Sequence, residues 1–423
     1  MRILFITNYY SPARYGWGYR QLCEEVADGL AAIGHALAVL TSTHRNGPEP
    51  PRPYPVHRLL HIEPDWESPF PAAWQFFAGR RRRERQAVAH LRRLLTRFRP
   101  EAIMVWHAIG LPRAMLQVAE QEAAGPVVYY LADYQPEIAD EYLQYWQNQA
   151  HRPAAALFKR MAAPLALKML AKEGKPVPIH YDNVICVSDY VRRRLVSKNL
   201  ISPQAVVIHN GVNLAQFSPS ASPLSFANGL RCLVMGRLVA EKGIHTVIEA
   251  FARLDSGANV TLTLLGDGPA AYRRQLRQQI QRYRLQDTIR FQPPVPREQI
   301  PDVLSRYNTL LFPSEYDEPL ARAMQEAMAK GLLVIGTTTG GSGELLSHRQ
   351  TGLVFEAGNP RSLAEQLRYA LEHPAVAAEL AQAGRREVVE NFNIERTVRR
   401  IEAYLAQVRR AWTVRHTLRD NSA

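Results

Sequence analysis

The chain has 423 residues and carries 52 lysines and arginines against 39 aspartates and glutamates, a formal net charge of +13. Its length predicts two or three domains, and 46% apolar residues is enough to form their cores. The sequence contains no run of about 18 consecutive apolar residues, so it predicts no membrane span. Three cysteines (Cys23, Cys186 and Cys232) are too few for a disulfide framework or a zinc ribbon. We therefore expect a folded cytosolic protein.

The chain opens with a predicted strand, loop, helix and second strand. Residues 2–7 are a short run of branched apolar side chains, which predicts a buried strand, and residues 8–18 contain the Pro and Gly typical of a loop. Apolar residues then recur at helical spacing from Leu22 to Ile33, and a second apolar run follows at 36–41. This alternation predicts parallel strands with helices on both faces of a sheet.

The same alternation continues along the chain and is interrupted once. Further strands are predicted at 102–106, 127–131, 183–187, 205–209, 231–235, 260–265, 289–291, 309–313 and 332–335. Residues 217–228 show no periodicity and predict a linker. The fold class is therefore α/β, with two Rossmann-like, doubly wound domains at 1–205 and 206–385 and C-terminal helices at 386–423 that pack back toward the first domain. We expect ligands at the carboxyl ends of the strands, in a cleft between the domains.

A glycine-flanked loop follows the first strand of the second half. Residues 236–243 read Gly-Arg-Leu-Val-Ala-Glu-Lys-Gly and lead into a helix that begins near Ile244. A helix N-terminus attracts phosphate, and Arg237 and Lys242 add two cations, so this loop would accept a pyrophosphate. The alternative is an ordinary surface loop whose charges are solvated.

A second loop, residues 314–320, follows a later strand and precedes a predicted helix at 321–330. The loop contains Glu318, and the helix contains Glu326, eight positions further along. Two such carboxylates can accept hydrogen bonds from the hydroxyl groups of two different sugars on either side of a pyrophosphate. The alternative is that both glutamates cap or decorate the helix.

Several shorter pieces accompany these two loops. They are His209-Asn210-Gly211-Val212-Asn213, Cys186-Val187-Ser188, Gly340-Gly341-Ser342-Gly343-Glu344, Thr351-Gly352-Leu353-Val354, and Ala327-Met328-Ala329 directly after Glu326. In this order, the motifs resemble the retaining, nucleotide-sugar-dependent glycosyltransferases of group four. The resemblance spans nearly the whole chain and is most specific in the C-terminal half. It implies the GT-B fold, in which two Rossmann-like domains face each other across a cleft.

The resemblance implies roles in donor binding. Arg237 and Lys242 would bind the diphosphate and stabilise the charge of the leaving group, while Glu318 would hold the hexose. The ribose would be held by Glu326, and further donor contacts would come from Gly236, from Val295 near the base, and from the amides of Leu320 and Ala321, where the family's usual glycine is absent. The family requires no metal and no cofactor besides the donor, and the sequence contains no Asp-x-Asp motif. His57 and His61 have i,i+4 spacing but no third ligand in view, so no metal site is predicted.

The N-terminal half departs from the family pattern. The family carries a Gly-Gly pair in its first loop, whereas here Trp17 separates Gly16 from Gly18, and either glycine fits the donor-phosphate role. Trp17 and Asp133 are candidates for contacting the acceptor, although a Trp that packs beneath the loop is an equal alternative. His107, after the predicted strand at 102–106, is expected near the anomeric carbon as a catalytic candidate. Its alternative is a hydrogen-bonded loop histidine.

The resemblance predicts a metal-independent hexosyltransferase that acts on a nucleotide diphosphate-sugar and a sugar, glycolipid or other hydroxyl acceptor, in glycan, glycolipid or cell-envelope polysaccharide synthesis. Retention would proceed without an enzymatic nucleophile, because the departing phosphate helps to deprotonate the acceptor while the protein orients both substrates. The alternatives are a nucleotide-sugar-binding protein, or an epimerase or hydrolase of the same fold. Nucleic-acid binding, which net charge alone suggests, has no supporting motif.

Residues 70–83 predict contact with a membrane. Trp74, Phe76 and Phe77 precede four consecutive arginines at 80–83, and aromatic and basic side chains together suit an anionic headgroup region. A helical apolar stripe follows at Val88, Leu91, Leu95 and Phe98, so the arginines are expected to face mostly outward. The protein would then be cytoplasmic and peripheral on the inner face of the membrane. The alternative is that the aromatic residues pack into the N-terminal domain and the arginines are simply solvated.

Overall fold

The computed structural model describes residues 1–13, 16–63, 74–138, 140–148, 153–174, 176–219, 224–255 and 257–420. The chain divides into two compact units, and each is described separately below. Unit 1 comprises residues 1–187, 191–208 and 398–423, and unit 2 comprises residues 188–190 and 209–397. The main divisions thus follow residues 208 and 397, where the sequence analysis placed them after 205 and 385.

Unit 1 is built on a parallel sheet that has seven strands within the described residues, in the order β3-β2-β1-β4-β5-β6-β7. The strands are β1 (Arg2–Ile6), β2 (Ala36–Ser42), β3 (Val56–Leu60), β4 (Ala102–Val105), β5 (Val127–Leu131), β6 (Asn183–Cys186) and β7 (Val206–Val207). All residues of β5 are buried, as expected for a parallel strand that is covered on both faces.

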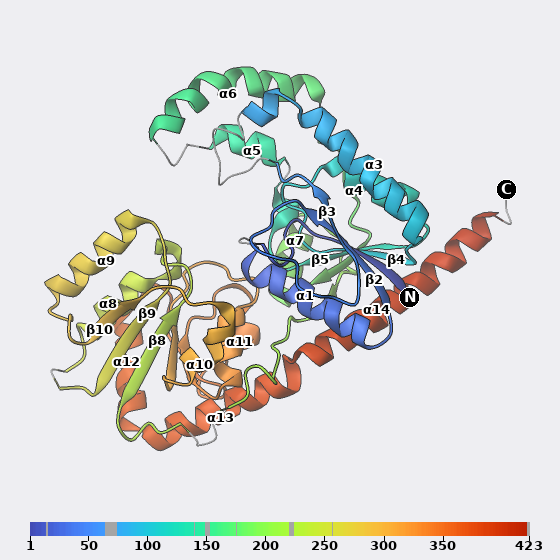
Figure 1. The fold of residues 1–423 in the computed structure, drawn as a ribbon. Helices are drawn as coiled ribbons and strands as arrows, with labels where there is room; N and C mark the ends of the chain where they lie inside the picture. The colour runs from blue at the N-terminus through green and yellow to red at the C-terminus, as the bar shows by residue number, and fades with distance from the viewer. Residues whose placement is uncertain are drawn as a thin grey trace. The chain divides into compact units, whose positions relative to one another are not determined.

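The helices of unit 1 cover both faces of its sheet. They are α1 (Trp17–Ala32), α3 (Arg80–Phe98), α4 (Arg113–Glu122), the short η1 (Gln135–Glu137), α5 (Glu141–Gln147), α6 (Pro153–Glu173), the part of α7 (Asp189–Ser197) that begins at Val191 and the part of α14 (Ile394–Asp420) that begins at Val398. Right-handed crossovers place α1 on one face and α3 and α4 on the other (Figure 1). Among the described helices, none is long and apolar enough to cross a membrane.

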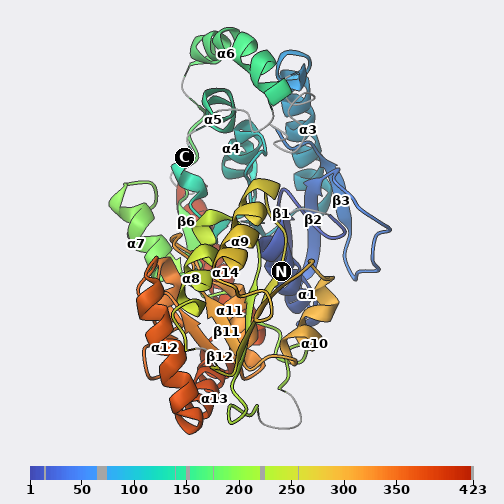
Figure 2. The ribbon, with the colours of Figure 1, turned by 90° about the vertical axis from the view of Figure 1, so that its left-hand side faces the viewer.

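Unit 2 repeats this architecture with a parallel sheet of six strands in its described residues, in the order β10-β9-β8-β11-β12-β13. The strands are β8 (Leu230–Met235), β9 (Val260–Leu265), β10 (Ile289–Gln292), β11 (Thr309–Phe312), β12 (Leu333–Gly336) and β13 (Leu353–Val354). The helices are η2 (Ala240–Lys242), α8 (Ile244–Phe251), α9 (Ala270–Arg282), η3 (Arg297–Gln299), α10 (Ile300–Leu304), α11 (Arg322–Ala329), η4 (Gly340–Glu344), α12 (Pro360–Glu372) and α13 (Pro374–Asn391). Figure 2 labels α8 to α13. One core of buried residues from α8, α12 and the strands joins the layers.

The structure confirms the α/β class and every predicted strand, and it adds β3 and β13. Because β3 holds His57, the i,i+4 spacing of His57 and His61 belongs to an extended segment and not to a helix. The apolar stripe of α3 also differs from the prediction. Leu91 is buried as expected, but Ala87 and Leu94 join it, whereas the other predicted members are only partly buried.

Candidate active site

Each sheet has one point where the strand order reverses, and the predicted site residues gather there. In unit 2 this point lies between β8 and β11, which pair with each other although their crossovers lead to opposite edges. Ligands of doubly wound sheets bind outside the carboxyl ends of the strands at such a point. The loop at 236–243 follows β8 and the loop at 314–320 follows β11, so the topology brings both predicted motifs together.

Backbone hydrogen bonds join the two loops of unit 2. The amides of Glu315 and Tyr316 donate to the carbonyl oxygen of Glu241 at 2.9 and 3.1 Å. Gly243, which caps α8, has φ of +64°, and an added Cβ would overlap the carbonyl oxygen of Pro313. Position 243 therefore requires glycine for both its conformation and its close approach to the end of β11.

Lys242 and Glu318 form an ion pair across the two loops, between Nζ and Oε1. The Glu318 carboxylate is buried and also accepts a hydrogen bond from Oγ of Ser314 at 2.7 Å. Thr337, at the end of β12, donates from its hydroxyl to the carbonyl oxygen of Ser314 at 2.7 Å, and Thr339 does so at 3.1 Å. The loops after three neighbouring strands of the sheet, β8, β11 and β12, thus hold one carboxylate and one ammonium group in fixed positions.

Arg237 lies in the same loop but is held differently. Its Nη2 donates to Oε1 of Glu241 at 2.9 Å, one helical turn away in sequence, and its side chain is 54% exposed, compared with 24% for Lys242. An exposed pair of this kind holds its partners weakly. Arg237 is therefore able to turn toward an incoming anion at little cost. Gly236, with φ of +137°, starts this loop.

Glu326 lies in α11 and is buried. Its Oε1 accepts from Nη2 of Arg297 at 2.6 Å and lies 3.8 Å from Nε of Arg322. The guanidinium of Arg297 also lies 4.8 Å from the ring centroid of Phe217. Glu326 belongs to the helix, whereas Glu318 precedes it in the loop. Each carboxylate has a different cationic partner, Lys242 for Glu318 and Arg297 for Glu326.

The backbone at Glu318 is tightly packed. Gly340, with φ of +62°, has no room for a Cβ beside the backbone of Glu318, and the amide of Gly341 donates to the Glu318 carbonyl oxygen at 2.6 Å. Leu320 and Ala321 are buried, and the N-cap residue Ala321 provides no side-chain cap for α11. The first turn of α11 therefore presents amides that its own N-cap side chain does not satisfy. Val295 lies half-buried between β10 and η3.

In unit 1, the corresponding reversal of strand order lies between β1 and β4, and the first loop follows β1. Gly16 is the N-cap of α1 with φ of +92°, and an added Cβ would press on Tyr9 and Arg20. Gly18 lies within the first turn of α1. The backbone conformation therefore requires glycine at position 16, while the side chain of Trp17 lies outside the described part of the structure.

His107 and Asp133 form a pair at the ends of β4 and β5. Nε2 of His107 lies 3.0 Å from Oδ2 of Asp133, and the ring of Tyr19 lies 4.4 Å from the His107 ring between centroids. The Tyr19 hydroxyl accepts from the amide of Ala132 at 2.7 Å. Burial, followed by the charge of Asp133, raises the pKa of Tyr19 well above its usual range, so the phenol stays protonated. His107 is therefore hydrogen-bonded to a carboxylate in this structure, and its role near the anomeric carbon stays a prediction.

Sequence reasoning missed three residues that position the predicted ones: Ser314, Arg297 and Tyr19. Each acts on a residue that is distant in sequence or lies across a turn, so no local spacing marks it. Their types offered a weak signal, since a buried carboxylate requires donors and arginine suits a carboxylate. No group of three or more His, Cys, Asp or Glu residues that could hold a metal ion occurs among the residues described.

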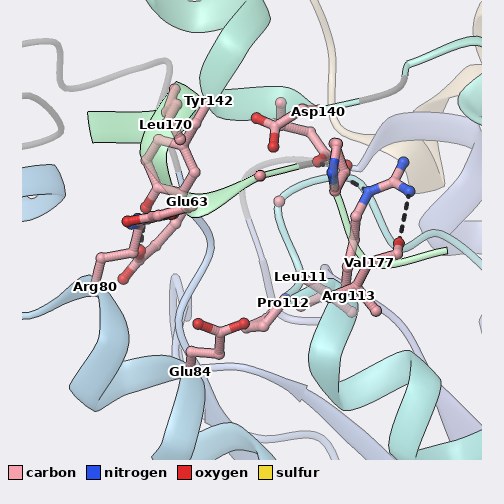
Figure 3. Close-up of a pocket in the computed structure, with 15 residues that line it drawn as sticks. Glu63, Arg80, Glu84, Leu111, Pro112, Arg113, Asp140, Tyr142, Leu170 and Val177 are labelled. Carbon is pink, nitrogen blue, oxygen red and sulfur yellow. Dashed lines mark hydrogen bonds and ion pairs between the residues drawn. The ribbon is translucent and has the colours of Figure 1, made fainter. Parts of the chain in front are cut away.

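A separate cavity of about 180 Å³ opens in unit 1 beneath α5 and the C-terminal end of α6 (Figure 3). Arg80 lines it, pairs with Glu173 and lies over the rings of Phe76 and Tyr142 at 4.9 and 5.2 Å. Arg83 pairs with Glu63, a second lining residue. The expectation that Arg80 to Arg83 mostly face outward is therefore wrong for two of the four.

The aromatic residues before this arginine run divide between the two alternatives. Phe76 is buried and Phe77 half-buried in a small cluster with α5 and α6, whereas Trp74 is 69% exposed. The arginines divide in the same way, because Arg81 is 74% exposed while it approaches Glu173 at 3.2 Å. Residues 64–73, which include the start of the predicted membrane segment, lie outside the described part.

Two family profiles match the chain, one for each half. "Glycosyltransferase Family 4" matches residues 18–216 and "Glycosyl transferases group 1" matches residues 221–387. Among curated relatives, the chain is 30% identical over 191 residues to glycogen synthase of Mycobacterium tuberculosis (45% of each chain) and 28% identical over 169 residues to N-acetyl-alpha-D-glucosaminyl L-malate synthase of Bacillus anthracis (40% of this chain, 43% of the other). A Bacillus subtilis protein with a glycosyltransferase name, YtcC, is 28% identical over 57% of this chain and 64% of its own. The chain thus spans between about two fifths and two thirds of the length of these relatives.

Solved structures share the fold along nearly the whole chain. HepE of Anabaena in complex with UDP is similar with a TM-score of 0.67 at 19% identity, covering 96% of this chain and all of that one. Sucrose-phosphate synthase of Thermosynechococcus elongatus is similar with a TM-score of 0.70 at 22% identity, covering 97% and 99%. The profiles, which cover most of the chain in the expected order, and the two parallel sheets place this chain in glycosyltransferase family 4, among the group 1 glycosyl transferases with the GT-B fold.

Proposed function

We propose that the protein is a retaining hexosyltransferase that moves a hexose from a nucleotide diphosphate-sugar to an acceptor hydroxyl, in the synthesis of glycans, glycolipids or cell-envelope polysaccharides. The observation that carries this proposal is the pair formed by Lys242 and Glu318 at the switch point of unit 2. It combines a cation for phosphate with a carboxylate for sugar hydroxyls beside the uncapped start of α11. The UDP bound in the HepE structure supports a nucleotide-sugar donor.

The chemistry follows from these groups. The acceptor oxygen forms a bond to the anomeric carbon as the bond from that carbon to the diphosphate oxygen breaks, and the acceptor proton passes to the departing phosphate. Arg237 and Lys242 stabilise the negative charge that develops on the diphosphate. Glu318 holds hydroxyl groups of the hexose, Glu326 holds the ribose, and the backbone near Val295 meets the base.

Unit 1 supplies the remaining groups in this proposal. The loop at Gly16 and Gly18 offers backbone to the donor phosphate. His107 acts near the anomeric carbon, where its pairing with Asp133 fixes the orientation of the ring. Trp17 and Asp133 remain the candidate acceptor contacts.

The proposal is tested with a panel of nucleotide diphosphate-sugars, scored by transfer to acceptor extracts and by donor hydrolysis without acceptor. Transfer that depends on acceptor supports it, whereas hydrolysis or epimerisation of the donor alone would favour the alternative functions. Glu326→Gln is expected to weaken nucleoside diphosphate binding roughly tenfold to hundredfold, because one charge-assisted hydrogen bond is lost. The control Glu365→Gln, which removes an exposed carboxylate paired with Arg361, should bind like the parent.

Turnover is expected to persist in excess chelator, because Arg237 and Lys242 occupy the electrostatic role that a metal ion would have. The measurement is the transfer rate with and without the chelator at saturating donor. Loss of activity that magnesium or manganese restores would contradict this part of the proposal.

A further inference from the structure

The outward face of α6 is unusually apolar for a solvent-exposed surface. Four of the nine large apolar side chains exposed in the described residues lie on this helix: Leu157, Phe158, Met161 and Leu165. Met161 is 73% exposed and Leu157 60%. Leu157, Met161 and Leu165 follow one another at four-residue spacing, so they form a continuous ridge. Single exposed apolar residues are ordinary, but a contiguous group marks a contact surface.

The inward face of α6 already has its partners. Ala166 and Leu170 are buried with Tyr145 and Trp146 of α5 and with Phe76. Figures 1 and 2 both show α6 at the outer edge of unit 1, with α5 between it and α4, while the N-terminal end of α3 reaches α6 through the pairs of Arg80 and Arg81 with Glu173. The ridge therefore points away from the core of unit 1, and that core does not explain it.

Within the described part of α6, the charges next to the ridge are positive. Residues 156–172 contain Lys159, Arg160, Lys168 and Lys172 and no acidic residue, although Lys159 belongs to the inward side, where its ammonium group lies 4.4 Å from the ring centroid of Tyr145. Arg160, Lys168 and Lys172 are exposed, and at 100° per residue Lys168 and Lys172 lie on the same face as Met161. The helix ends at Glu173, whose carboxylate pairs with Arg80 and Arg81.

We propose that this face of α6 docks on an anionic lipid surface, with the helix lying in the plane of the membrane. An anionic surface covers the apolar ridge and neutralises the adjacent cations at the same time, as basic amphipathic helices do. A second copy of the chain would bring like charges together across the ridge, which favours lipid over self-association. The docking surface is therefore α6, while Arg80 and Arg83 hold the local structure from within.

Docking would present the acceptor-binding unit to lipid-linked acceptors, and this consequence alone rests on the proposed function. The docking itself is independent of it, because the residues concerned are distinct from the donor-binding residues. Nucleoside diphosphate binding in the absence of lipid is therefore expected to be unchanged in every α6 variant. This separates failure of the docking proposal from failure of the proposed function.

The experiment is sedimentation of the full chain with vesicles of neutral phosphatidylcholine, or of phosphatidylcholine with an added anionic phospholipid. We expect binding to the anionic vesicles at low salt, release at high salt, and little binding to neutral ones. Met161→Ser combined with Leu165→Ser should weaken binding by about tenfold or more, and Lys168→Ser combined with Lys172→Ser by about tenfold. The matched control, Ile33→Ser combined with Val414→Ser, changes two exposed apolar residues elsewhere in unit 1 and should bind like the parent.

Three outcomes would overturn the proposal. The first is equal binding to neutral and anionic vesicles, and the second is no binding to either. The third is a dimer in analytical ultracentrifugation that the Met161→Ser and Leu165→Ser changes abolish, since a second copy would then cover the ridge. Melting temperatures of all variants guard against loss of the fold, and a variant that melts early is replaced by Met161→Gln with Leu165→Gln.

Discussion

At the scale of single residues, the two cations proposed to bind the diphosphate, Lys242 and Arg237, each pair with a carboxylate, and the two carboxylates differ in burial. Lys242 contacts the buried Glu318, whereas Arg237 contacts the exposed Glu241. Removing one member of a buried pair leaves the other charge without compensation, but removing one member of an exposed pair costs little. Stability and function are therefore separable at these two cations.

This difference predicts that only one of the two alanine substitutions lowers stability. Lys242→Ala should lower the free energy of unfolding by roughly 1–3 kcal/mol, because the buried Glu318 carboxylate loses its cationic partner and keeps the hydrogen bond from Ser314. Arg237→Ala should leave stability within about 0.5 kcal/mol of the parent. Both should lose most of their transfer activity, since both cations face the diphosphate in the proposed reaction.

The measurements are chemical denaturation and the transfer rate for each variant. Adding Glu318→Gln to Lys242→Ala should recover much of the lost stability without recovering activity, because the uncompensated carboxylate is then gone. Normal turnover in either single variant would remove the phosphate-binding role of that residue. Equal stability of the two single variants would mean that burial does not distinguish the pairs.

At the scale of elements, the candidate residues lie on loops at the carboxyl ends of strands or, like Glu326 and Gly18, in the helices that follow those loops, and the strand order decides which loops meet. The strands could be predicted because parallel strands that are buried on both faces are nearly continuous in apolar residues. The loops at 8–18 and 236–243 could be predicted because they contain glycine. β3 escaped prediction because Val-His-Arg-Leu-Leu at a sheet edge mixes apolar and charged residues, and β13 because it has two residues.

The candidate site could be predicted only in part, because local motifs are visible in the sequence and long-range contacts are not. Arg237, Lys242, Glu318 and Glu326 stand in local motifs, so their spacing was visible. The contact of Arg297 with Glu326 spans 29 positions, and the contact of Lys242 with Glu318 spans 76. Such contacts depend on the sheet order, which no local pattern determines.

The Gly243 position predicts a larger cost than an ordinary turn glycine. Gly243→Ala should destabilise by more than about 2 kcal/mol and impair transfer, because it adds a clash with the end of β11 to the strain of a positive φ. The control is Gly34→Ala, where φ is +94° but a Cβ would meet nothing within 4 Å, so only about 1–2 kcal/mol of strain is expected. Similar losses of melting temperature in the two variants would contradict the close approach at position 243.

At the scale of the whole molecule, the same architecture occurs twice, and the long C-terminal helix has residues in both units. α14 begins in unit 2 with Ile394, and its residues from Val398 onward belong to unit 1. There Val398 packs so closely on Gly29 of α1 that a Cβ on that glycine would be crowded, and Arg409 pairs with Glu101. The C-terminal helix is therefore a structural part of the N-terminal unit.

This assignment predicts where a change in α14 is felt. Leu405 is fully buried, so Leu405→Ala should lower the free energy of unfolding by about 2–5 kcal/mol through lost burial and a residual cavity. Because residue 405 belongs to unit 1, native-state hydrogen exchange should show loss of protection in β1 and β4 and little change in β8 and β11. The control Val414→Ala alters an exposed side chain of the same helix and should leave exchange unchanged. Equal loss of protection in both sheets would show instead that the units unfold as one.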